Sequence, residues 1–247
     1  MNSYDCSNNL KEESKENKLK NKFDNLKSDY FLEKVFKIMN KKKSLEIIKY
    51  NKKIQNRLKI NVNSYKEYLE IYSSIELEII PVLNEYGKFI NIEKEEDRKY
   101  YHIYFNYDEE EAKRTELYED ENVSKINIII DYQIISFNKL FYNCKCIESI
   151  YFKKFYRNNI TNMSGMFWEC SSLKELNLSN FNTNNVINMN DMFNGCISLD
   201  ELNLSNFNIK NVTYMSFMFA YCSDELKNKI RAQLKNFKKE AFYDISL

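Results

Sequence analysis

Apolar side chains in the second half of the chain recur at a fixed interval of 26 residues. An internal repeat of about 20 to 50 residues is the strongest sequence indication of a repeat architecture. One copy cannot bury its apolar face alone, so we expect the copies to stack on one another. The interval is kept by a phenylalanine and, three residues later, by a cysteine: Phe141, Phe167, Phe193 and Phe219, then Cys144, Cys170, Cys196 and Cys222.

Each repeat opens with large apolar residues at its first, fourth, sixth and ninth positions. The three copies read I-E-S-I-Y-F-K-K-F from Ile147, L-K-E-L-N-L-S-N-F from Leu173 and L-D-E-L-N-L-S-N-F from Leu199. This pattern predicts a strand, and the apolar residues from Val186 to Cys196 follow at helical spacing. We therefore expect an α/β fold, a solenoid of about four coils, each with one strand and one helix.

The repeat L-N-L-S-N-F-N-T-N-N-V, followed by N-M, M-F and a cysteine, resembles the BspA-type leucine-rich repeat family of 26-residue-repeat surface proteins. Between Leu173–Cys196 and Leu199–Cys222, 15 of 24 positions are identical, and the resemblance covers residues 121–224. The opening coil, Val123–Cys146, is degenerate and keeps only the apolar register. The resemblance implies a leucine-rich-repeat solenoid that binds other proteins. The opening coil's apolar register comprises Ile126, Ile129, Ile134, Phe137, Leu140 and Phe141.

The chain before the repeats divides into three parts by its hydrophobic pattern. Residues 1–17 have almost no apolar side chains and predict a disordered tail. Residues 18–62 have apolar residues at helical spacing, with Lys41–Lys43 as a turn. Residues 63–120 predict a small β element, because apolar and polar residues alternate from Ile75 to Ile79 and from Tyr101 to Phe105, with a short strand at Phe89–Ile92 between them.

The segment after the repeats, residues 225–247, places Leu226, Ile230, Leu234 and Phe237 along one helical face. We expect a helix that caps the open end of the stack, with Asp224 as its N-cap. A helix that binds a partner is the alternative.

Composition limits the possible function classes. The formal net charge is +1, from 37 basic and 36 acidic residues, which gives no global field toward nucleic acid or an anionic membrane. We find no secretory segment and no apolar run of about 18 residues, so we expect a cytoplasmic protein, with the cell surface as the less favoured location. Six cysteines in a reducing compartment are expected to be free thiols.

The residue types needed for catalysis are scarce. The sole histidine, His102, lies in an alternating strand, and three scattered glycines cannot form a phosphate-binding loop. Only Cys144 and Cys146 are close together, which is not zinc-ligand spacing. The acidic run Asp108–Glu111 is expected to be a solvated loop. We therefore predict no catalytic, cofactor-binding or metal-binding residues, and a protein that is not an enzyme.

Positions between the core residues of each strand would face the inner curve of the solenoid, where repeat proteins commonly bind partners. The alternative is a surface that only keeps the protein soluble. Tyr151, Lys153, Lys154, Tyr156 and Arg157 form the one aromatic and basic cluster on this stretch. The candidate partner-binding residues are Lys125, Asn127, Ser149, Tyr151, Lys153, Glu175, Asn177, Ser179, Glu201, Asn203 and Ser205.

These observations favour a monomeric protein-interaction module whose inner face binds protein partners of unknown identity, without nucleic acid. A surface adhesin is the second hypothesis, because the resemblance is to surface proteins. A third is an F-box-like adaptor, in which the helical stretch Tyr30–Ile60 docks a ligase scaffold and the repeats hold a substrate.

Overall fold

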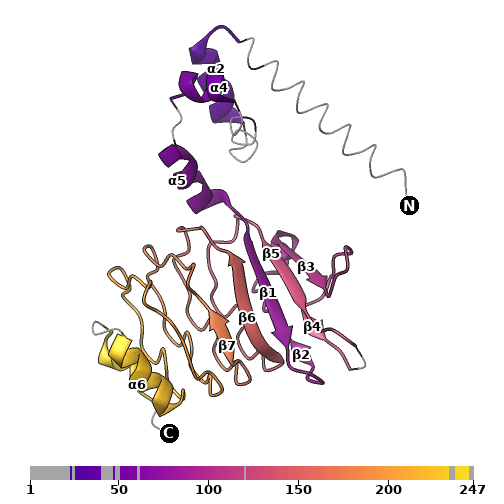
Figure 1. The fold of residues 1–247 in the computed structure, drawn as a ribbon, viewed down its shortest axis with the longest axis vertical. Coiled ribbons are helices and arrows are strands. Elements are labelled where there is room, and N and C mark those ends of the chain that lie inside the picture. The colour runs from indigo at the N-terminus through magenta and orange to yellow at the C-terminus, as the bar shows by residue number, and fades with distance from the viewer. Residues whose placement is uncertain are drawn as a thin grey trace. The chain divides into compact units, whose positions relative to one another are not determined.

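The computed structural model describes residues 23, 26–39, 47, 51–59, 62–119, 121–233 and 237–244. The tail expected at residues 1–17 and the turn expected at Lys41–Lys43 lie outside the described residues. The chain divides into two compact units, Met1–Tyr72 and Ser73–Leu247 (Figure 1). The expected boundaries near residues 62, 120 and 224 stay predictions.

The first unit contains helices α2 (Asp29–Ile38), α4 (Lys52–Arg57) and α5 (Val62–Tyr72). Local capping explains where two of them begin. The Ser28 hydroxyl accepts a hydrogen bond from Phe31 N at 3.4 Å, and Asn51 Oδ1 accepts one from Ile54 N at 3.1 Å. A small apolar cluster is buried in this unit and comprises Leu32, Ile47 and Ile54.

The second unit is built on a mixed sheet of five strands, β1 (Ile75–Pro81), β3 (Tyr101–Phe105), β5 (Ile126–Ile130), β6 (Ile147–Lys154) and β7 (Glu175–Asn177). Their order is β3-β5-β1-β6-β7. Strand β1 runs antiparallel to both β5 and β6, whereas β6 and β7 are parallel (Figure 1). A strand that precedes the repeats in sequence therefore lies between two strands of the repeat region.

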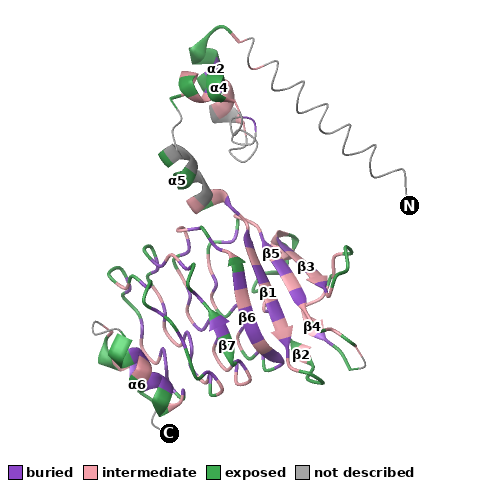
Figure 2. Cartoon of the chain, in the orientation of Figure 1, coloured by how far each residue is buried: buried purple, intermediate pink, exposed green. Residues whose placement is uncertain are grey.

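One face of this sheet is buried (Figure 2). The strands predicted around residues 75–79 and 101–105 are confirmed, and both alternate between buried and half-buried residues. Strand β5 buries Ile126, Ile128 and Ile130, so Ile129, which we expected in the apolar register, lies on the opposite face. The antiparallel pairing of β5 with β1 fixes this register.

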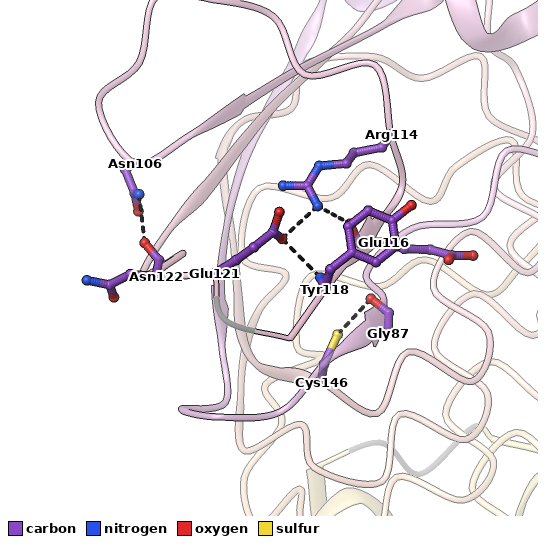
Figure 3. Close-up of polar contacts among 8 residues, drawn as sticks. All are labelled: Gly87, Asn106, Arg114, Glu116, Tyr118, Glu121, Asn122 and Cys146. Carbon is purple, nitrogen blue, oxygen red and sulfur yellow. Dashed lines mark hydrogen bonds and ion pairs between the residues drawn. The ribbon is translucent and has the colours of Figure 1, made fainter.

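A small antiparallel sheet joins β2 (Gly87–Lys88) to β4 (Glu116–Leu117). The strand expected at residues 89–92 is wrong, because Phe89 and Ile90 are both buried in succession, which alternation does not allow. The loop that carries β4 is tied by Arg114, whose Nη1 donates to Glu121 Oε2 at 2.6 Å and to Glu116 O at 3.2 Å (Figure 3).

The 26-residue copies stack through their phenylalanine rings. Neighbouring rings of Phe141, Phe167, Phe193 and Phe219 have centroids 5.5 to 5.6 Å apart and lie within 10° of parallel. After the last copy, Phe242 continues this stack on Phe219 at 5.2 Å. The predicted apolar columns are therefore part of the core, and all four of these repeat phenylalanines are fully buried.

The repeated cysteines bond the copies to one another. The thiols of Cys170, Cys196 and Cys222 donate to the carbonyl oxygen of a phenylalanine in the preceding copy, at 2.9, 3.1 and 3.1 Å. The expectation of buried free thiols is confirmed for the five cysteines that the structure describes. Cys6 lies outside these residues.

The predicted solenoid of strand-and-helix coils is wrong. Among the described residues of 135–222, the segments expected to be helical form turns, because the backbone enters the left-handed region twice in each copy. These positions are Lys139, Gly165, Asp191 and Phe217, then Asn143, Glu169, Gly195 and Tyr221, with φ between 54° and 75°. A left-handed residue ends a right-handed helix. The regular structure of this unit is thus sheet, with few helices.

Helix α6 (Asp224–Gln233) follows the last copy and buries Leu226 and Ile230. The predicted N-cap, Asp224, is wrong, because Ser223 Oγ accepts the hydrogen bond from Leu226 N at 3.1 Å. Lys227, only 4% exposed, pairs with Asp244 Oδ1 at 2.8 Å and fastens the segment after the helix.

We expect Phe193→Ala to lower the free energy of unfolding by about 3 to 5 kcal/mol, because it opens a cavity in the middle of the ring stack. Tyr214→Ala removes a side chain that is 55% exposed and is the matched control. Urea denaturation of both variants measures the difference. Equal unfolding midpoints would contradict the assignment of the stack to the core.

The buried thiols predict a loss of stability at alkaline pH. Burial raises the pKa of Cys146 from 9.0 to about 11 and that of Cys222 to about 12. The folded protein holds these protons more tightly than the unfolded chain, so this stability is complete below pH 9 and is lost as pH rises toward 12.

We expect Cys222→Ala to flatten the alkaline slope by up to about 1.4 kcal/mol per pH unit. Urea unfolding at several pH values from about 8 to 10.5, with the wild-type chain as the reference, measures this slope. Identical slopes for the two proteins would show that the Cys222 thiol ionises equally in both states.

Candidate functional site

The face of the five-stranded sheet that points away from the core carries polar side chains, and we call it the polar face. One cross-strand row on it contains Tyr104, Asn127, Glu78, Tyr151 and Asn177, each from a different strand. Their neighbours along each strand point into the core, because side chains alternate between the two faces. The sheet therefore brings residues from position 78 to position 177 into one row.

The sequence-predicted site residues do not all lie next to one another. Lys125 and Asn127 belong to the β5 side of the sheet, and Ser149 and Tyr151 belong to β6, with β1 between the two. We had expected these strands to be neighbours in a stack. Strand β1 adds Glu78 and also Glu76, which sequence reasoning missed. The alternation of both glutamates with isoleucine and leucine places them on this face, but nothing in the sequence pairs β1 with the repeats.

Glutamates of β1 pair with lysines on both sides. Glu78 lies 3.6 Å from Lys125 Nζ and 3.1 Å from Lys153 Nζ, and Glu76 lies 2.8 Å from Lys154 Nζ. A bulge in the pairing of β1 with β6 allows the two consecutive lysines to reach carboxylates of the same strand. The Glu78 side chain is only 18% exposed, so this pair is better shielded than ordinary surface ion pairs. The charges of the polar face are therefore largely balanced within the sheet.

Tyr151 is fixed in place by a short hydrogen bond from its hydroxyl to the Glu175 carboxylate. This bond, together with the nearby negative charges, raises the pKa of Tyr151. Because β6 and β7 are parallel and in register, the contact links adjacent copies of the repeat. Lys174 and Glu148 make a second link between these copies at 2.8 Å, which raises the pKa of Lys174.

The asparagines predicted to stack as a ladder instead stabilise turns. Asn177 Oδ1 accepts from Ser179 N, and Asn203 Oδ1 accepts from Ser205 N, both at 3.0 Å. These four residues and Glu201 are exposed. Of the predicted site residues, Ser149 is the one that is buried, at 5% exposure.

Arg157 does not belong to the surface cluster in which we placed it. It is fully buried, and its guanidinium donates to Asp131 O at 3.0 Å and to Ile134 O. Burial lowers the pKa of Arg157 to about 10, against the opposing effects of Tyr101 and Asp131. This side chain holds the backbone at residues 131–134, and it was unpredictable because nearby lysines in the sequence are exposed or half-exposed.

His102 lies on the polar face at the edge strand β3. Its Nδ1 is 3.5 Å from Glu111 Oε2, and its Nε2 is 3.7 Å from Asp131 Oδ2. The pKa of Glu111 is lowered chiefly by a hydrogen bond from Lys113, with a smaller effect from His102. Both ring nitrogens thus face carboxylates, and the side chain has the half-exposed position that we expected, at 33%.

Comparison with known proteins gives one match. Residues 135–244 are similar to the family described as Mycoplasma protein of unknown function, DUF285. No curated protein and no solved structure matches the chain. In the described ranges, no helix combines the length and the apolar character needed to cross a membrane.

The resemblance to the BspA-type leucine-rich repeat family is therefore wrong. The repeat region matches the DUF285 family, and neither a BspA-type nor another leucine-rich-repeat family matches it. The 26-residue period is real, but the spacing of leucines and asparagines that suggested the resemblance also suits copies that are joined by turns.

We expect Arg157→Lys to lower the free energy of unfolding by about 2 kcal/mol or more, because one ammonium group cannot replace the two-pronged contact with the carbonyls of residues 131 and 134. Arg231→Lys, on the exposed side of α6, is the control. Thermal or urea unfolding measures both. A change no larger than that of the control would show that the carbonyl contacts contribute nothing to stability.

Proposed function

We propose that the chain is a non-enzymatic protein-interaction module that binds a protein partner through the polar face. The observation that supports this most is the row from Tyr104 to Asn177, in which five strands present polar or aromatic side chains at matched register. Tyrosine is enriched where proteins bind one another, because its ring and hydroxyl both contribute to contacts.

The rigidity of the face supports the proposal. Strand pairing fixes the backbone of β1, β5 and β6, and Tyr151 is already oriented by Glu175. A partner would order few additional side chains on binding, which reduces the entropic cost.

The character of the face favours a protein over a small molecule or a nucleic acid. Two cavities of this unit are lined by residues outside the row. Lys125, Lys153 and Lys154 each pair with a glutamate of β1, so they form no uncompensated basic patch of the kind that binds phosphate backbones.

The other two hypotheses have lost their basis. The surface adhesin rested on the resemblance to surface proteins, and the F-box-like adaptor rested on leucine-rich repeats that hold a substrate. The expected cytoplasmic location and monomeric state stay predictions.

We expect Tyr151→Ala to weaken partner binding by roughly tenfold or more, as for an aromatic residue central to an interface. Proximity labelling in the native cell would identify the partner, and calorimetry with the purified pair would measure the affinity. Tyr214→Ala is the matched control, because Tyr214 is exposed and lies outside the polar face. Equal affinities of the two variants, with both still folded, would exclude the polar face as the binding surface.

A further inference from the structure

A cavity of about 280 Å³ lies beside the first residue of β3, away from the row on the polar face. Residues 91–97 form one wall, and residues 133–140 form the other. Asn91 N donates to Leu140 O at 2.7 Å, so a backbone hydrogen bond joins the two walls. The cavity has room for roughly nine water molecules at about 30 Å³ each, which is enough for one small organic molecule.

Tyr101 lines this cavity and has an unsatisfied hydroxyl. The residue is only 6% exposed, yet its hydroxyl forms no hydrogen bond with any residue in the described part of the chain. A buried phenol normally has a partner, because burying the hydroxyl without one costs free energy. Burial and the charges of Asp97 and Glu93 raise the pKa of Tyr101, so the hydroxyl keeps its proton. A bound ligand atom would satisfy it.

Two carboxylates beside this hydroxyl are also unpaired. Glu93 and Asp97 line the cavity, and neither forms an ion pair with the residues described by the structure; the same is true of Lys94 between them. Acidic side chains therefore outnumber basic ones in the lining. The rest of the lining includes aliphatic side chains, among them Ile135, which is 55% exposed, and Leu140.

Buried Arg157 stabilises one wall. Its bonds to the carbonyls of Asp131 and Ile134 hold the backbone that leads into Gln133 and Ile135. It is fully buried and is absent from the lining, so its charge cannot form a direct contact with a ligand. The wall is thus formed before any ligand binds.

We propose that this cavity binds a primary ammonium group carried on a short aliphatic chain. An ammonium group has three N–H donors, and the carboxylates of Asp97 and Glu93 and the hydroxyl oxygen of Tyr101 supply three acceptors. The aliphatic chain of the ligand lies against Ile135 and Leu140. An anion is disfavoured by the two carboxylates, and a neutral chain leaves them without a partner.

The test is an NMR titration of the ¹⁵N-labelled full chain with three probes, n-pentylammonium, 1-pentanol and glucose. We expect n-pentylammonium to shift the amide signals of residues 91–97 and 133–140, and 1-pentanol to bind roughly tenfold more weakly or not at all. Asp97→Asn should weaken the ammonium affinity by roughly tenfold, and Tyr101→Phe should weaken it while it preserves the packing of the ring. Tyr104→Phe, on the opposite face of the same strand, is the matched control and should change nothing.

Three results would overturn the proposal. The first is no localised shift with n-pentylammonium, and the second is equal affinity for the ammonium and the alcohol, which would indicate an apolar pocket. The third is preferential binding of glucose, which would assign the cavity to polyols. Thermal unfolding of each variant distinguishes lost binding from lost structure, and Asp97→Asn, at a half-exposed position, is expected to keep the fold.

Discussion

The repeat region depends on the contact between identical side chains of successive copies. Each phenylalanine ring lies nearly parallel to the ring 26 residues away, and the nearby thiol donates to the carbonyl of the preceding copy. The ring contact is apolar and the thiol bond is directional, so together they fix both the spacing and the register of the copies. The sheet can present one polar face only because this packing fills the other.

The balance of charges on the polar face follows from the position of β1. A strand outside the repeats contributes Glu76 and Glu78 to a surface whose lysines come from β5 and β6. Without β1, Lys125 and Lys153 would belong to an uncompensated basic patch. The proposed interaction surface is therefore a joint product of the repeats and of the segment that precedes them, although the match to DUF285 covers only residues 135–244.

Sequence reasoning succeeded where one pattern decides the structure. The 26-residue period predicted the ring stack and the buried thiols, and alternation predicted β1 and β3. It failed where long-range pairing or unusual backbone decides. Nothing local indicates that β1 lies between β5 and β6, and left-handed positions such as Glu169 and Phe217 are not glycine, so the turns looked helical. The candidate residues on β6 and β7 were found, but their neighbours on β1 and the burial of Arg157 were not.

The same insertion of β1 has a consequence for the order of folding. Lys154 on β6 contacts Glu76 on β1 across 78 positions of the chain, so the central pairing of the sheet is strongly non-local. During synthesis, β1 emerges from the ribosome long before β6, and both of its edges stay unpaired until the repeat region follows. Such non-local pairing slows folding and exposes strand edges meanwhile. The nascent chain thus passes through an interval in which β1 needs protection from aggregation, even though the finished sheet leaves no free edge there.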